Sequence, residues 1–175
     1  MPTTPGALEA MISKKTLRLY ESLGILTHRE QEARYEISLE TYTKKIQIES
    51  RIIADMVNNQ IVPAAIAYQK VLVDNVAGLK NIMNAADFKK TADTQLALIK
   101  EISERVTIII KAAEDMREER KKANNLEGAK KQASVYCEKV KPYFDLIRYQ
   151  VDKLEFIVDD ATWPLPKYRE MLFLR

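Results

Sequence analysis

The fold is decided by residues 133–158, which read ASVYCEKVKPYFDLIRYQVDKLEFIV. Apolar side chains recur here at alternating spacings of four and three residues, and they are Ala133, Cys137, Val140, Phe144, Ile147, Val151, Leu154 and Val158. This spacing places them along one face of an α-helix, where a partner helix can cover them. It predicts a long amphipathic helix over residues 126–158, with a local kink near Pro142 because proline cannot donate the helical hydrogen bond.

The same periodicity predicts two more long helices in the preceding sequence. Residues 85–123 carry an apolar stripe at Phe88, Ala92, Ile99, Ile102, Val106, Ile109, Ala113 and Met116. Residues 28–83 carry another, at Leu39, Tyr42, Ile46, Ile53 and Met56, which Ala64, Ala67, Tyr68, Val71 and Leu72 continue. Because the pattern continues beyond Pro63, we expect a kink near this proline rather than the end of the helix.

Local signals mark where these helices begin and end. Thr27 followed by Glu30 is a capping box, in which each side chain accepts from the other residue's backbone N–H. Asn84 suits the N-cap of the next helix. Gly24 suits the end of a short helical segment over residues 6–24, because glycine adopts positive φ without a Cβ clash.

Together these elements predict an all-α fold. It is an elongated antiparallel bundle of three to four long amphipathic helices, with a short N-terminal helical segment and a Trp-Pro-rich C-terminal tail over residues 159–175. With only 4 Gly and 6 Pro, the chain has few turn residues, which agrees with long helices and short connections. We expect residues 1–175 to form a single helical domain.

The composition excludes several classes of protein. The 28 basic and 25 acidic residues give a net charge of only +3, which does not favour a nucleic-acid or membrane partner. No apolar run approaches the roughly 20 residues of a membrane span, and the N-terminus lacks the features of a signal peptide. The single cysteine, Cys137, cannot form an internal disulfide, so we expect a cytoplasmic location.

The residues that usually carry chemistry are sparse and scattered. His28, the only histidine, is expected at the solvent-facing start of a helix, far in sequence from Cys137. A zinc site needs a cluster of such ligands, and no glycine-rich phosphate loop is present. The carboxylates alternate with Lys and Arg at helical spacing, as on ordinary solvated helices. The sequence therefore predicts no catalytic, cofactor-binding or metal-binding residue.

The C-terminal tail is the candidate docking segment. Trp163, Pro164, Leu165, Pro166 and Tyr168 follow the last long helix, where no local core is available to cover them. An aromatic and proline-rich segment of this kind either folds back on the bundle or docks on another domain. The sequence leaves both possibilities open.

Parts of the sequence are compatible with two alternative functions. Residues 13–26 are similar to the recognition-helix region of MerR-type DNA-binding transcription regulators, but no basic wing follows and little sequence precedes them for the first helix of a helix-turn-helix. A free-standing helical adaptor without a catalytic domain is the other alternative.

A longer resemblance covers essentially the whole chain. The chain closely resembles the C-terminal end of type III glutamine synthetases, and the resemblance is carried by residues 32–36, 45–51, 140–149, 151–155, 158–160 and 163–173. It implies a cytoplasmic ligase that makes glutamine from glutamate and ammonia with ATP and Mg or Mn, and that assembles as a dodecamer. It also implies an upstream catalytic domain and neighbouring subunits as partners.

The resemblance places no catalytic, ATP-binding or metal-binding residue of that family on this chain. Full chains of the family are several times longer, so we expect a domain fragment that is inactive alone and has a structural, subunit-assembly role.

Overall fold

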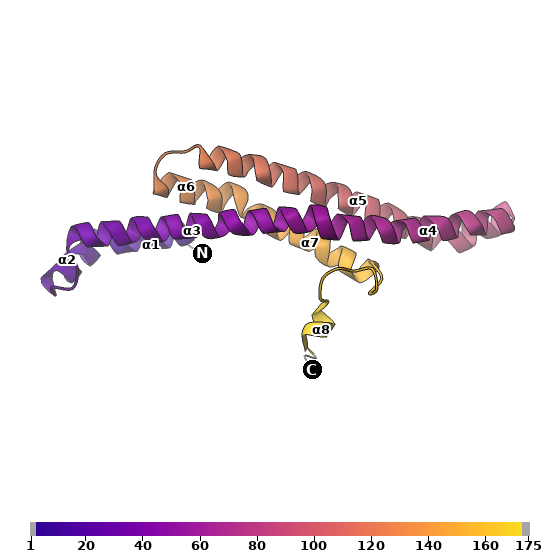
Figure 1. The fold of residues 1–175 in the computed structure, drawn as a ribbon, viewed down its shortest axis with the longest axis horizontal. Coiled ribbons are helices and arrows are strands. Elements are labelled where there is room, and N and C mark those ends of the chain that lie inside the picture. Colours follow the sequence, from indigo (N-terminus) through magenta and orange to yellow (C-terminus); the bar gives the residue numbers. More distant parts are fainter. Residues whose placement is uncertain (1–2, 173–175) are drawn as a thin grey trace. The chain divides into compact units, whose positions relative to one another are not determined.

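The computed structural model describes residues 3–172, and each regular element within that range is a helix (Figure 1). The all-α class predicted from the sequence is therefore confirmed. Residues 173–175 of the predicted tail and the side chain of Tyr168 lie outside the described residues. The chain divides into two compact units, one of Met1–Ile52 with Asp115–Phe144 and the other of Ile53–Glu114 with Asp145–Arg175.

The first unit begins with short helices. Helix α1 (Thr4–Leu8) is followed by a 3-10 turn (Glu9–Ile12) and by α2 (Lys14–Ser22). The unit also contains the start of α3 (His28–Met56), the end of α5 (Ala85–Asn124), all of α6 (Ala129–Val135) and the start of α7 (Pro142–Ile157).

The core of the first unit joins its short helices to α3 and α6. Tyr35, Leu39 and Ala133 are buried together, and they are covered by the partly buried side chains of Leu8, Ile12, Tyr42 and Ala129. Leu39 is only 1% exposed. Helix α1 and the 3-10 turn thus pack against the hydrophobic core through Leu8 and Ile12.

Both predicted caps of the first unit are present. The Thr27 backbone N–H donates to the Glu30 carboxylate at 2.8 Å, and the Glu30 N–H donates to the Thr27 hydroxyl at 3.3 Å. Gly24 has a φ of 68°, in the left-handed region that glycine tolerates best. The last long helix begins at Ala129 rather than at the predicted Leu126, because Gly128 has a φ of 93° and interrupts the helical backbone.

A polar contact crosses from α3 to the end of α5 in this unit. The Gln47 amide donates to Asn124 Oδ1 at 3.1 Å, and the Tyr136 hydroxyl donates to the same oxygen at 2.6 Å. The Tyr136 side chain is fully buried. One carbonyl oxygen of Asn124 therefore satisfies a donor from each of two other helical segments.

The second unit contains the remaining helical segments. They are the end of α3, a π-helical turn (Val57–Ile61), α4 (Val62–Ile82), the start of α5, most of α7 and α8 (Tyr168–Leu172). Its most buried apolar side chains, all at 0% exposure, are Val57, Ala65, Ala92, Ile102, Ile109 and Leu154. Gln69 donates to Ser103 at 2.6 Å, and Arg105 donates to Gln150 at 2.8 Å.

A π-helical turn precedes each of the two mid-helix prolines. The turn at Val57–Ile61 comes before Pro63, and the turn at Tyr136–Val140 comes before Pro142. In each, the residue just before the proline donates to a carbonyl five residues back, Val62 to Val57 and Lys141 to Tyr136. A wider turn keeps the chain helical where the proline ring would clash with the carbonyl four residues back.

The π-helical turn also changes which residues of α4 are buried. The stripe predicted beyond Pro63 included Ala67 and Val71, but both are exposed, and Ala65 and Val76 are buried instead. A π turn contains an additional residue, so it rotates the following apolar positions relative to a continuous 3.6-residue repeat. The inward face after Pro63 therefore cannot be extrapolated from the face before it.

Helix α5 begins with a cap that can be tested. Asn84 Oδ1 accepts from the backbone N–H groups of Ala86 and Asp87 at 3.1 and 3.0 Å. We expect Asn84→Ala to lower the free energy of unfolding by about 1 kcal/mol, because two helix donors lose their acceptor. Urea denaturation followed by circular dichroism measures this loss. Asn84→Ser is the control and should retain most of the stability, since serine is also a good N-cap; an equal loss in both variants would contradict the cap.

Candidate functional site

The predicted docking tail begins with an ordered turn. The N–H groups of Thr162 and Trp163 both donate to the backbone carbonyl of Asp159 at 3.0 Å, and the N–H of Ala161 donates to the Asp159 carboxylate at 3.1 Å. The Trp163 side chain is only 7% exposed. Trp163 is thus a buried side chain.

Beyond Trp163, the tail offers a partly exposed surface. Pro164 and Pro166 are exposed, and Leu165 is half-buried. The indole Nε1 of Trp163 is buried without a hydrogen-bond partner among the described residues. The docking role of this segment stays a prediction, and among its described side chains the two prolines and part of Leu165 are accessible.

A cluster of charges fixes the tail after the prolines. Asp160 forms ion pairs with Lys167, at 2.5 Å, and with Arg169. The Lys167 ammonium also donates to the Val158 carbonyl at 3.0 Å, and the Lys167 backbone N–H donates to the Glu170 carboxylate at 3.2 Å. Lys167 therefore connects the end of α7 with the start of α8.

This charge cluster predicts acid sensitivity of the tail. The hydrogen bonds from Lys167 and Arg169 hold the pKa of Asp160 below its ordinary value of 3.8. Because the pKa is lowered in the folded state, the contribution of Asp160 to stability is complete above that ordinary value and is lost as the pH falls through the lowered pKa. We expect Trp163 fluorescence to report loosening of the tail in this acid range. Asp160→Asn should show the loosened signal already at neutral pH, and identical profiles for the two proteins would contradict this role.

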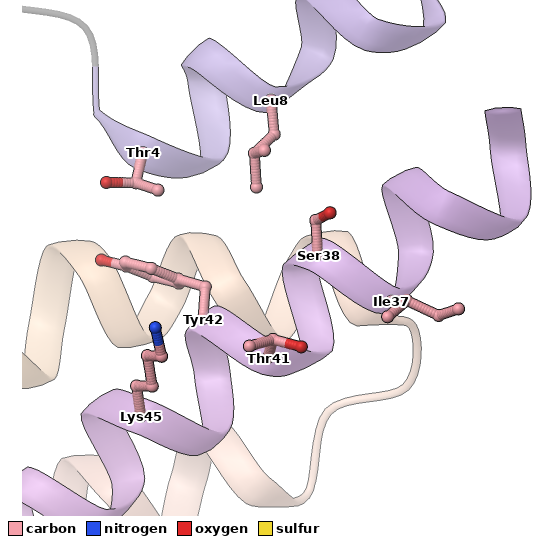
Figure 2. Close-up of a pocket in the computed structure, with 7 residues that line it drawn as sticks. All are labelled: Thr4, Leu8, Ile37, Ser38, Thr41, Tyr42 and Lys45. Carbon is pink, nitrogen blue, oxygen red and sulfur yellow. The ribbon is translucent and has the colours of Figure 1, made fainter.

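A shallow pocket of about 290 Å³ lies in the first unit, between α1 and α3 (Figure 2). Thr4 and Leu8 of α1 line one side, and α3 supplies the other side through Ile37, Ser38, Thr41, Tyr42 and Lys45. Burial raises the pKa of Tyr42, and the Cys137 thiol beside its hydroxyl raises it further. A neutral phenol and one lysine do not make a set of groups for acid–base chemistry.

His28 and Cys137, the residues whose types most often take part in catalysis or metal binding, lie at separate places in the structure. His28 begins α3 at the surface, and its Nε2 lies 3.1 Å from the Glu21 carboxylate. Cys137 is a free, half-buried thiol. Within residues 3–172, no group of three or more His, Cys, Asp or Glu side chains is arranged to hold a metal ion.

Helix α7 presents an exposed apolar stripe that the sequence analysis did not single out. Leu146, Tyr149 and Phe156 are 42%, 56% and 87% exposed, and their spacing of three and seven residues places them on one face. The stripe lies beside the buried seam that contains Ile147 and Leu154. The signal for this second face is present in the sequence, because Leu146, Tyr149 and Phe156 also recur at helical spacing.

No helix in the described range is both long enough and apolar enough to cross a membrane. The fold and its surfaces thus define an all-helical domain that, among residues 3–172, has an exposed apolar face on α7 and an exposed proline-rich segment in its tail.

Comparison with known proteins places this domain in a family. Residues 1–80 match the family described as the glutamine synthetase C-terminal domain. A glutamine synthetase of Bacteroides fragilis is 44% identical over 151 residues, which are 86% of this chain. The type-3 glutamine synthetase of Dictyostelium discoideum is 32% identical over 175 residues, the whole of this chain, and a glutamine synthetase of Butyrivibrio fibrisolvens is 29% identical over 169.

The chain belongs to the family of glutamine synthetase C-terminal domains. It spans 21% of the length of the Bacteroides relative and 24% of the length of the other two. The resemblance to type III glutamine synthetases noted from the sequence is confirmed by these matches.

Proposed function

We propose that this chain is a non-catalytic, structural C-terminal domain of a type III glutamine synthetase, with a role in subunit assembly. The observation that carries the proposal is the 32% identity to the type-3 enzyme of Dictyostelium discoideum over all 175 residues. A similarity that extends along the whole chain requires the same buried seams and helix ends, and not merely a shared short motif.

The proposed architecture is the elongated antiparallel bundle of long helices with its Trp-Pro-rich tail. The parent enzyme in this proposal is a cytoplasmic ligase of nitrogen metabolism, which makes glutamine from glutamate and ammonia. ATP and Mg or Mn would be bound by its catalytic domain. The comparisons support this function over the DNA-binding and adaptor alternatives.

The exposed apolar side chains support the assembly role. Phe156 is 87% exposed at the end of α7, and Tyr149 and Leu146 extend the same stripe. Exposed aromatic side chains are typical of surfaces that another protein segment covers. We assign as the occupant the remaining polypeptide of the synthetase, because the relatives continue over a much greater length than the part matched here.

The proposal is tested by exchanging domains between this chain and its Bacteroides relative. In the Bacteroides fragilis enzyme, the matched segment of 151 residues is replaced by this chain, and glutamine formation from glutamate, ammonia and ATP is measured. We expect the exchanged enzyme to be active and the purified 175-residue chain to form no glutamine. Turnover by the isolated chain would overturn the non-catalytic assignment.

A further inference from the structure

Two arginines of the first unit lie together, and neither forms an ion pair with a carboxylate among residues 3–172. Arg51 is on α3 and Arg120 is on α5, and each lies one helical turn from a member of the Gln47–Asn124 contact. The two helical segments run in opposite directions within this unit (Figure 1). Residues four apart share a helix face, so moving one turn from that contact along both helices brings Arg51 beside Arg120.

Both guanidinium groups are near enough to Tyr136 for their charges to act on its hydroxyl. The charges of Arg120 and Arg51 both act to lower the pKa of Tyr136, opposing the increase that burial causes. The Tyr136 side chain is fully buried and its hydroxyl bonds to Asn124, so these two residues form a fixed polar floor one helical turn from the two arginines.

The charges of this pair are not compensated within the described residues. Burial and the Arg51 charge lower the pKa of Arg120, and Arg117 adds a third positive charge. The nearby carboxylates of α5 are paired elsewhere, Glu118 with Lys121 at 2.8 Å and Glu119 with Lys122 at 2.6 Å. Two adjacent cations without an anion destabilise the domain that holds them.

The polar floor also offers a donor. Asn124 Oδ1 accepts from both Gln47 and Tyr136, so its amide NH₂ group points away from these bonds and, among the described residues, donates to no other group. Asn124 is exposed, Arg51 is exposed and Arg120 is half-buried, which leaves the site open to solvent. Two guanidinium groups and an amide are all donors, and they match the acceptor oxygens of one planar or tetrahedral anion.

We propose that Arg51, Arg120 and Asn124 form a binding site for one oxyanion group, a carboxylate or a phosphate. The anion supplies the negative charge that the fold itself lacks at this point, and it accepts hydrogen bonds from both guanidinium groups. The group is either a free anion or an acidic side chain of the longer synthetase polypeptide. This site goes beyond the proposed function, and its first test does not depend on that function.

The first test uses the 175-residue chain and inorganic phosphate at low ionic strength, with isothermal titration calorimetry as the measurement. We expect one phosphate to bind per chain, and Arg51→Gln to weaken this binding by about tenfold or more, because a charge-assisted hydrogen bond is lost. Arg148→Gln is the matched control: it removes the same charge from an exposed site on α7, where Arg148 lies 3.7 Å from Asp152. Its affinity for phosphate should equal that of the unmodified chain.

Stability without phosphate gives a second and independent readout. We expect Arg51→Gln to raise the urea midpoint in phosphate-free buffer, because it relieves repulsion with Arg120. Phosphate should raise the midpoint of the unmodified chain and of Arg148→Gln equally, and that of Arg51→Gln much less. The proposal is overturned if phosphate does not bind, if both Gln variants bind it equally, or if Arg51→Gln lowers the midpoint in phosphate-free buffer.

The Bacteroides enzyme that carries this chain distinguishes the two possible sources of the anion, a free anion and an acidic side chain of the synthetase. If an acidic side chain of the synthetase occupies the site, Arg51→Gln should lower the assembled mass. If a free anion occupies it, the mass should be unchanged, while phosphate binding to the isolated chain is still lost. Failure of the exchanged enzyme to form glutamine would contradict the proposed function, whereas loss of phosphate binding by the isolated chain concerns this site alone.

Discussion

Ile147→Asp should lower the free energy of unfolding by roughly 3–5 kcal/mol, the largest loss among the substitutions considered. Ile147 is only 3% exposed and lies on the buried seam of α7, two turns from the fully buried Leu154. A carboxylate at this position would lose its water without gaining a partner, and its charge would disrupt the packing of the second unit. Urea denaturation followed by circular dichroism measures the loss.

The matched control for this substitution lies on the same helix. Phe156→Asp introduces the same carboxylate at a side chain that is 87% exposed. It should leave the stability of the isolated chain nearly unchanged, because the new charge remains in water. Equal losses for Ile147→Asp and Phe156→Asp would contradict the assignment of the buried and exposed faces of α7.

Leu39→Ala should lower the free energy of unfolding by roughly 3 kcal/mol, the second largest effect. Leu39 is 1% exposed, and it packs with Tyr35 and Ala133 in the core of the first unit. The substitution removes three heavy atoms and leaves a cavity among rigid helices, which cannot close fully around it. The loss is measured by the same urea denaturation.

Ile37→Ala provides the comparison for the first unit. Ile37 lies two residues away on α3 but is 61% exposed, so its truncation should cost much less. A small loss for Leu39→Ala, similar to that for Ile37→Ala, would show that the short N-terminal helices do not cover this part of α3.

Local rules predicted much of this fold because they depend on neighbours in sequence. All eight residues of the predicted seam over 133–158 are buried or half-buried, since helical periodicity fixes which side chains share a face. The capping box at Thr27 and the cap at Asn84 form the expected hydrogen bonds. Each cap is complete within four residues of chain, and the seam repeats a spacing of three or four residues.

The π-helical turns were not predicted because proline alone does not determine how the backbone accommodates it. At Pro63 the sequence indicates only an irregularity, while packing decides that Val57 and Ile61 are both buried within the turn. The resulting shift of the apolar face explains why Val71, expected inside, is exposed.

The candidate sites also depend on packing between residues that are distant in sequence, which local patterns do not predict. Trp163 was an unassigned aromatic in sequence, and its burial depends on a turn around Asp159 and on ion pairs to Asp160. Arg51 and Arg120 are far apart in the chain, and only the pairing of α3 with α5 brings them together. Exposure of Phe156 likewise depends on which faces of α7 find a partner.

The most direct test of the proposed assembly role is the mass of the Bacteroides fragilis glutamine synthetase, measured by light scattering after size-exclusion chromatography. The enzyme is compared intact, without its matched 151-residue segment, and with this chain in place of that segment. We expect the deletion to lower the number of subunits per particle, calculated from the mass, and this chain to restore it. Full assembly of the enzyme without the segment would contradict the assembly role.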